Sequence, residues 1–314
     1  ERSEAGVELN TLLQYKPYST ARTEKRALYA GLLTGLTQFH REHCPEYGRL
    51  LDALGCPAHM DCTVESTPML PVSLFKELEL RSIPEGEVFK TITSSGTTGQ
   101  RVSRIFLDGA TSACQQQALC QIMSDFLGER RLPFLVLDSR QVLRNRAMFS
   151  ARGAGILGFS IFGTRPCYAL DEHMELDLDG VRAFLEEHQG ETIFLFGFTF
   201  MIWKHVVRAL EERGERLDIP NGILVHGGGW KKLAGEAVSP GEFKARVAAA
   251  TGVERVSNYY GMAEQTGCIY MECPQGHLHA SLWSDIVVRR GRDYRPCEPG
   301  EEGVLQVLSP LPRS

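Results

Sequence analysis

Short apolar segments alternate with helical patterns through most of the chain, and this alternation limits the fold more than any other feature. Strands separated by single helices form parallel sheets that carry helices on their faces. The sequence therefore predicts an α/β fold with mainly parallel sheets flanked by helices. The expected strands are 88–93, 103–107, 134–137, 156–162, 192–196, 222–226 and 253–259, and the expected helices are 109–128, 178–188, 200–213 and 241–250.

The two ends of the chain have different patterns. Residues 24–54 have apolar residues at helical spacing, which predicts a helical N-terminal layer. After Tyr270, short strand-like runs at 282–289 and 303–308 lie between Gly, Pro and Asp turns, which favours a small antiparallel unit. We expect an α/β core with this helical layer over 1–270 and a β-rich subdomain over 271–314. A further tail or small domain is expected beyond Ser314.

Charge and composition exclude several classes of partner. The 314 residues have a net charge of −5 and no basic run, which disfavours nucleic-acid binding. No uninterrupted apolar stretch is long enough to predict a membrane span. The nine cysteines are scattered rather than regularly spaced, which favours reduced thiols and a cytoplasmic protein.

A run of small hydroxyl residues and glycines follows the expected strand at 88–93. Glycine lets the backbone approach an anion, and hydroxyls with turn N–H groups can donate hydrogen bonds to phosphate oxygens. No lysine follows the last glycine, so this is not the ordinary phosphate-loop pattern. The pattern predicts a phosphate-binding loop, with a solvated turn as the alternative. The run consists of Ser94, Ser95, Gly96, Thr97, Thr98 and Gly99.

Two more glycine turns follow expected strands. Gly227, Gly228 and Gly229 come after 222–226 and favour close approach of a flat or bulky group, with a flexible loop as the alternative. Tyr259 to Glu264 come after the strand at 253–259, where an aromatic beside glycine can wall a pocket and the carboxylate could bind Mg²⁺. A surface turn is the alternative there. Ligands bind at the carboxyl ends of parallel strands, so we predict that the three turns converge on one nucleotide.

The three turns together resemble motifs of the adenylate-forming superfamily, which includes acyl-CoA ligases, luciferases and peptide-synthetase adenylation domains. Ser94–Gly99 is similar to its phosphate loop, Tyr260–Glu264 to its Tyr-Gly-x-Thr-Glu motif, and Gly300–Leu305 to its later Gly-Glu motif. Within it, the chain resembles most the acyl-protein synthetases of bacterial bioluminescence, the LuxE family. That likeness extends over nearly the whole chain and includes Leu70–Lys76, Phe89–Ser103, His226–Lys232 and Asn258–Thr266.

The resemblance implies that the chain activates a fatty acid with ATP and Mg²⁺ as acyl-AMP. Acyl transfer to a protein thiol and delivery to a partner reductase, or to an acyl-carrier protein, would follow. Ligation to CoA, as in phenylacetate-CoA ligase, and a catalytically silent nucleotide-binding subunit are the alternatives. The implied roles are phosphate binding by Ser94 to Thr98, Mg²⁺ binding by Glu264, and contact with adenine by Gly228, Gly229, Tyr259 and Tyr260, with Gly261 and Met262 in the same motif.

The chain departs from the superfamily pattern at several points. Ala263 stands where the superfamily has threonine, and Gln265 or Thr266 could replace the lost hydroxyl. The ribose-binding aspartate motif, the C-terminal lysine and the acyl-accepting cysteine are not found before Ser314, so we expect them in a segment beyond it.

His226 and a phenylalanine run are candidates for substrate contacts. His226 could orient the substrate carboxylate or the adenylate, with a hydrogen-bonded histidine at a strand end as the alternative. Alternate residues of a strand share one face, so Phe196, Phe198 and Phe200 could line an acyl pocket with Phe194. Ordinary sheet core is the alternative for these side chains.

Cysteines and histidines gather within a short stretch after residue 267. Both are the usual ligands of zinc, although no Cys-x-x-Cys pair is present. A zinc site is therefore one hypothesis, and core cysteines beside a strand-borne histidine pair are the alternative. The candidate ligands are Cys268, Cys273, His277 and His279.

Overall fold

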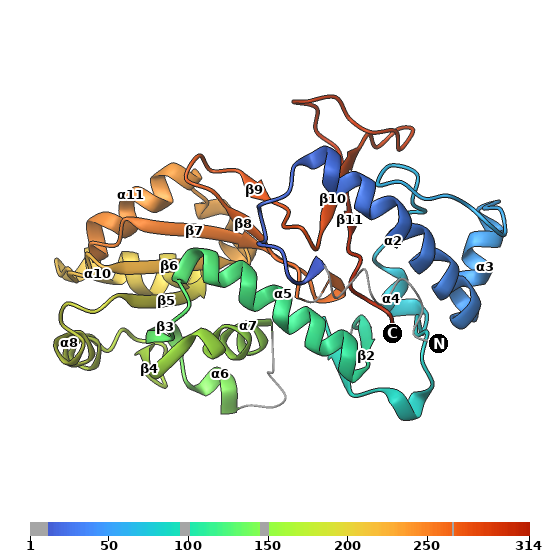
Figure 1. Ribbon diagram of the computed structural model, residues 1–314. Coiled ribbons are helices and arrows are strands. Elements are labelled where there is room, and N and C mark those ends of the chain that lie inside the picture. The colour runs from blue at the N-terminus through green and yellow to red at the C-terminus, as the bar shows by residue number, and fades with distance from the viewer. Residues whose placement is uncertain (1–11, 95–100, 145–150, 266) are drawn as a thin grey trace. The chain divides into compact units, whose positions relative to one another are not determined.

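A seven-stranded, mostly parallel sheet confirms the predicted α/β fold (Figure 1). The computed structural model describes residues 12–94, 101–144, 151–265 and 267–314. Neighbouring strands lie in the order β4, β3, β5, β6, β7, β8 and β9. The pairs from β4 to β7 are parallel, and β8 with β9 is antiparallel. The strands are β3 (Leu132–Ser139), β4 (Gly163–Leu170), β5 (Ile193–Phe198), β6 (Gly222–Gly227), β7 (Arg255–Tyr260), β8 (Tyr270–Glu272) and β9 (Leu278–His279).

The central strands β5 and β6 are apolar along their whole length because helices cover both faces of the sheet. Every residue of both strands is buried. Strands of this kind are typical of parallel sheets, in which crossover helices shield each face from water. The register places Phe198 beside Gly227, and Gly227 beside Tyr259 of β7.

The crossover helices begin and end where the local sequence satisfies their free backbone groups. Ser239 accepts a hydrogen bond from the Glu242 backbone N–H at the start of α11, and Pro240 occupies its first turn. Gly252 ends that helix in the left-handed region, with φ +75°. No helix in the described ranges has both the length and the apolar character needed to cross a membrane. The helices around this sheet are α6 (Gln141–Arg144), α7 (Ala151–Phe159), η3 (Ser160–Phe162), α8 (Leu178–Glu187), α9 (Thr199–Ile202), η4 (Trp203–Val207, a π turn), α10 (Arg208–Arg213), η5 (Lys231–Glu236) and α11 (Pro240–Thr251).

Two predicted elements were wrong. The expected strand at 156–162 is the end of α7 followed by the 3-10 turn η3, and the strand begins only at Gly163. A short apolar run has no periodicity that separates a buried strand from a buried helix. The phenylalanine run also leaves the strand early: β5 ends at Phe198, and Phe200 lies in α9.

The chain divides into two compact units, and the sheet dominates the second. Unit 1 contains residues 1–125, 261–270 and 280–314, and unit 2 contains residues 126–260 and 271–279. The predicted division at 270/271 stays a prediction. The elements of unit 1, with α5 continuing two residues into unit 2, are α2 (Arg22–His43), α3 (Pro45–Ala53), α4 (Leu74–Glu77), η1 (Glu85–Glu87), β1 (Lys90–Thr93), β2 (Arg104–Leu107), α5 (Gly109–Leu127), η6 (Ala263–Gln265), β10 (Asp285–Arg289) and β11 (Val304–Leu308).

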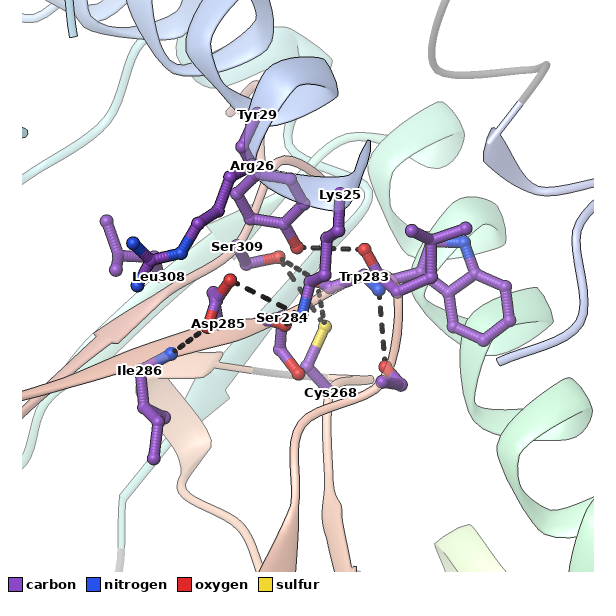
Figure 2. Close-up of polar contacts among 12 residues, drawn as sticks. Lys25, Arg26, Tyr29, Cys268, Trp283, Ser284, Asp285, Ile286, Leu308 and Ser309 are labelled. Atoms are coloured by element: carbon purple, nitrogen blue, oxygen red, sulfur yellow. Dashed lines mark hydrogen bonds and ion pairs between the residues drawn. The ribbon is translucent and has the colours of Figure 1, made fainter. Parts of the chain in front are cut away.

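Helix α2 is fastened to the C-terminal part of unit 1 by buried polar groups (Figure 2). The Lys25 ammonium donates to the Ser284 carbonyl at 2.6 Å and lies 3.5 Å from the Asp285 carboxylate. The Tyr29 hydroxyl donates to the Leu282 carbonyl at 2.9 Å. Burial lowers the pKa of Lys25, and the Asp285 carboxylate opposes that shift. The apolar core beneath consists of Tyr29, Leu33, Cys62, Val64, Val287 and Leu308.

Candidate functional site

The carboxyl ends of β5, β6 and β7 bring several predicted site residues together in unit 2. The register pairs Phe198 with Gly227 and Gly227 with Tyr259, and paired residues of neighbouring strands share one face of a sheet. Any side chain at Gly227 would meet the Tyr259 ring, since a Cβ atom there would lie 2.7 Å from Cε1. Burial raises the pKa of the Tyr259 hydroxyl above its usual value. This face therefore has a closely packed aromatic edge.

The glycines after β6 hold a left-handed turn at this edge. Gly228 has φ +79° and Gly229 has φ +61°, a region that other residues adopt only at a cost. A Cβ atom at Gly228 would lie 2.5 Å from the Phe198 ring, whereas Gly229 faces open space. The structure thus gives Gly227 and Gly228 an internal reason, which is room for aromatic rings. Only at Gly229 is space left for a ligand to approach the backbone.

The predicted acyl-binding phenylalanines are packed side chains of the sheet core. Phe196 is fully buried and stacks on Phe159 of α7 at 4.3 Å between ring centroids. Phe198 is 4% exposed, and its ring lies where a Cβ atom at Gly155 of α7 would be. Phe200, in α9, is half-buried instead of continuing the strand face. The observed packing fits the alternative of ordinary sheet core, and an acyl-binding role stays a prediction.

His226 lies on the opposite face of the sheet from Tyr259. It pairs in register with Gly197 and Asn258, one position away from the Phe198–Gly227–Tyr259 row. Its ring centroid lies 4.6 Å from that of Phe243 in α11, which covers that face. The two predicted site residues therefore cannot contact one ligand from the same side of the sheet.

The hydrogen bonds of His226 indicate its tautomer. The Thr199 hydroxyl lies 2.9 Å from His226 Nδ1 and donates its one proton to the Gly227 carbonyl at 3.1 Å. His226 therefore carries its proton on Nδ1 and donates it to Thr199. Its Nε2 is buried without a hydrogen-bond partner among the described residues. Burial, and then the positive charge of Lys244, lowers the pKa of His226 to about 3.

Three charged residues at the carboxyl edge were not selected from the sequence. Asp138, at the end of β3, has a fully buried side chain and accepts two hydrogen bonds from Arg152 of α7, at 2.9 and 2.5 Å. Lys231 follows the glycine turn, and its ammonium lies 5.8 Å from the Phe198 ring centroid and 5.3 Å from that of Phe200. A charged residue directly after an apolar strand was the signal for Asp138.

Ser94 closes a hairpin in unit 1, below the predicted phosphate loop. Its hydroxyl accepts a hydrogen bond from the Ser103 backbone N–H at 3.0 Å, where β1 and β2 pair antiparallel. This confirms the two strands expected on either side of the loop. The loop residues Ser95, Gly96, Thr97, Thr98 and Gly99 lie outside the described residues.

Glu264 lies on the short 3-10 turn η6 of unit 1 and is half-buried. The preceding Gly261 is exposed and Met262 is half-buried. Gln265 is engaged elsewhere, because its amide donates to the Leu308 carbonyl at 3.0 Å and accepts from the Tyr270 hydroxyl at 2.8 Å. Gln265 therefore does not replace the missing threonine hydroxyl, and Thr266 lies outside the described residues.

The predicted nucleotide residues are divided between the two units. Ser94 and residues 261–264 belong to unit 1, while Gly228, Gly229, Tyr259 and Tyr260 belong to unit 2. Tyr260 is 42% exposed at the end of β7. Convergence of the three turns on one nucleotide stays a prediction.

The candidate zinc ligands have separate roles. The Cys268 thiol donates to the Trp283 carbonyl at 3.2 Å and lies 3.5 Å from the Ser309 hydroxyl, inside unit 1 (Figure 2). Cys273, His277 and His279 belong to unit 2, where the β8–β9 turn joins Cys273 to His277 through their backbones. Within the ranges that the structure describes, no three His, Cys, Asp or Glu side chains gather into a metal site.

Comparison with known proteins relates the whole chain to one family. The family described as "Acyl-protein synthetase, LuxE" matches residues 4–314. A curated relative, the long-chain-fatty-acid–luciferin-component ligase of Vibrio harveyi, is 20% identical over 321 residues, which cover 98% of this chain and 82% of the relative.

Solved structures share the fold at low sequence identity. A 2-hydroxyisobutyryl-CoA ligase, in complex with 2-HIB-AMP and CoA, superposes with a TM-score of 0.67 at 18% identity. The match covers 95% of this chain and 62% of the ligase, so the chain spans less than two thirds of that protein. The same enzyme with 2-HIB-AMP in its postadenylation state gives a TM-score of 0.66 at 14% identity, covering 98% of this chain and 67% of the ligase.

Proposed function

Because the chain belongs to the acyl-protein synthetase family LuxE, we propose that it activates a long-chain fatty acid with ATP, forming acyl-AMP and pyrophosphate. The printed name of the Vibrio harveyi relative supports the substrate class, and the 2-HIB-AMP complex of a protein with the same fold supports the adenylate. The observation that carries the proposal is the family match over residues 4–314. The open backbone at Gly229, beside the aromatic carboxyl edge of the sheet, gives a flat group such as adenine a place to lie.

The proposed reaction needs charge neutralisation and alignment more than a general base. A fatty acid is already ionised near pH 7, so its carboxylate can attack the α-phosphorus while pyrophosphate leaves. The hydroxyls of Ser94 to Thr98 would donate hydrogen bonds to the phosphate oxygens. His226 is neutral, with its proton on Nδ1, and stays a candidate for orientation rather than for proton transfer.

Glu264 is the candidate ligand for Mg²⁺. Proteins usually bind Mg²⁺ through one or two carboxylates, and substrate phosphates and waters complete its shell. A single half-buried carboxylate on a short turn fits this requirement. Bound there, Mg²⁺ would neutralise charge that develops on the phosphates.

Transfer of the acyl group is the further part of the proposal. We expect the adenylate to pass its acyl group to a protein thiol, for delivery to a reductase or another acyl-accepting protein. Ligation to CoA is the second candidate, because the 2-hydroxyisobutyryl-CoA ligase shares the fold. Incubation with ATP, a fatty acid and either CoA or a candidate acceptor protein separates the two. Thioester formation with CoA alone would favour the ligase.

A pyrophosphate exchange assay tests the activation step. With radiolabelled pyrophosphate, ATP and a panel of fatty acids, we expect acid-dependent incorporation of label into ATP. Absence of exchange with every acid would refute the proposal and leave a silent nucleotide-binding subunit.

Substitution Glu264→Ala tests the role of that carboxylate. We expect exchange to fall more than about 100-fold, because a bound metal contributes several kcal/mol of charge stabilisation. The melting temperature should stay unchanged, since Glu264 is only half-buried. Glu85→Ala is the matched control, because Glu85 is also a glutamate on a 3-10 turn of unit 1. Unchanged activity of the Glu264 variant would remove the carboxylate from the site.

A further inference from the structure

The carboxyl edge of the sheet in unit 2 has more positive than negative charge on one face. Asp138 and Arg152 satisfy each other through two hydrogen bonds, and the Asp138 side chain is fully buried. Lys231 adds a second cation beside them. Its nearest described partners are the Phe198 and Phe200 rings, and no described carboxylate forms an ion pair with it. This edge therefore has room for one more negative charge.

The three residues surround the same ring, Phe198. Phe198 fills the space beside Gly155, which lies one turn after Arg152 on α7. Asp138 is two residues beyond Val136, and Val136 pairs with Phe196, so continued pairing places Asp138 beside Phe198 on one face. The Lys231 ammonium lies 5.8 Å from the centre of that ring.

The backbone fixes the direction from which Lys231 approaches. Lys231 has φ +47°, directly after the left-handed turn at Gly228 and Gly229. A residue other than glycine rarely adopts this conformation, and such strained positions are concentrated at functional sites. The lysine is therefore held over the rings by the turn, whereas an ordinary surface lysine has no such constraint.

We propose that Lys231, supported by Arg152, binds the carboxylate of the fatty acid before it attacks ATP. This inference rests on the proposed function and adds a residue that positions the substrate. Lys231 keeps its proton throughout, because the carboxylate oxygen forms the bond to the α-phosphorus and the electron pair of the broken bond leaves with pyrophosphate. Burial, and then the nearby charge of Arg152, lowers the pKa of Lys231, and a bound anion would relieve that repulsion.

The surroundings favour a carboxylate over a phosphate as the ligand. A fatty acid has an anionic head and an apolar chain, which matches a cation set against two aromatic rings. Phosphate groups are usually bound by several backbone N–H groups and hydroxyls, and the resemblance places those in the 94–99 loop. The acid and the phosphates would then have separate anchors.

A binding experiment with a matched pair of ligands tests the proposal directly. Octanoate and octanol share one chain length and differ in charge. For the wild type we expect octanoate to bind about 10- to 100-fold more tightly than octanol, the range for one charge-assisted hydrogen bond. In Lys231→Met, which keeps a long side chain but no charge, the two ligands should bind equally. Lys231→Arg should retain much of the preference, and Lys204→Met, at an exposed lysine of the π turn, should retain all of it.

The kinetic form of the experiment separates failure of this inference from failure of the proposed function. In pyrophosphate exchange, Lys231→Met should raise the KM for octanoate about 10- to 100-fold and leave the KM for ATP unchanged. A raised KM for ATP with an unchanged KM for octanoate would overturn the carboxylate assignment in favour of a phosphate contact. Equal behaviour of Lys231→Met and Lys204→Met would also overturn it, although the activation reaction would stand. If the wild type exchanges with no acid, the proposed function fails, and the calorimetric preference for octanoate over octanol still decides whether Lys231 binds the anion.

Discussion

Acidification should destabilise this protein through His226, and substitution of that residue should remove the effect. The ring is 5% exposed, and its pKa is lowered to about 3, first by burial and then by Lys244. An unfolded chain binds the proton at an ordinary pKa of about 6.5. Between these two values the unfolded state takes up a proton that the folded state refuses. The contribution of His226 is therefore complete above about pH 6.5 and is lost as the pH falls toward 3.

The size of the effect follows from the two pKa values. Linkage with a folded pKa of 3 and an unfolded pKa of 6.5 removes about 2 kcal/mol from the free energy of unfolding between pH 7 and pH 5. The loss approaches about 5 kcal/mol when the pH reaches the folded value. Carboxylates titrate over the same range, so the difference between wild type and His226→Gln is the informative quantity.

Urea unfolding at several pH values between 7 and 5 measures that difference. The stability advantage of the wild type over His226→Gln should shrink by about 2 kcal/mol across the range. His59→Gln, at an exposed histidine, should follow the wild type at every pH. Parallel curves for wild type and His226→Gln would refute the buried neutral imidazole. An NMR titration of the His226 ring in the wild type checks the same point without a variant, and a midpoint near 6.5 would contradict the reasoning.

Two further substitutions test the packing at the carboxyl edge. Gly228→Ala should lower the free energy of unfolding by about 1–3 kcal/mol more than Gly229→Ala in urea titrations, because both residues are left-handed but only the first would clash with Phe198. Equal losses would show that the ring contact does not matter. Arg152→Met should cost about 3–5 kcal/mol by leaving the Asp138 carboxylate buried and unpaired, and adding Asp138→Asn should recover most of it. A double variant as unstable as Arg152→Met alone would contradict this.

The sequence was most informative where periodicity and punctuation agree. The helix at 178–188 and the buried strand at 222–226 were predicted to within a residue or two, because long amphipathic patterns and fully apolar runs each have one stable setting in a parallel sheet. The segment 156–162 failed because its apolar residues continue a helix whose Phe159 stacks on the sheet. Only the tertiary contact decides such a case.

The candidate site was predicted by motif and corrected by geometry. His226 and Tyr259 end adjacent strands, but strand alternation places them on opposite faces, and sequence order alone does not give the register that decides this. Asp138 and Arg152 were missed because a salt bridge between a strand end and a later helix has no sequence signature. Lys231 was part of a quoted motif, but its place over two rings depends on a left-handed backbone that the sequence does not reveal.

The interrupted path of unit 1 sets an order for folding during synthesis. Lys25 and Tyr29 bond to residues 284 and 282, more than 250 positions later, with nearly all of unit 2 translated in between. The parallel strands β3 to β7 are complete in the nascent chain before these partners of α2 have left the ribosome. Helix α2 must then wait with its apolar stripe uncovered, so that chaperone dependence in the cell should be traced to the first helix made rather than to the last.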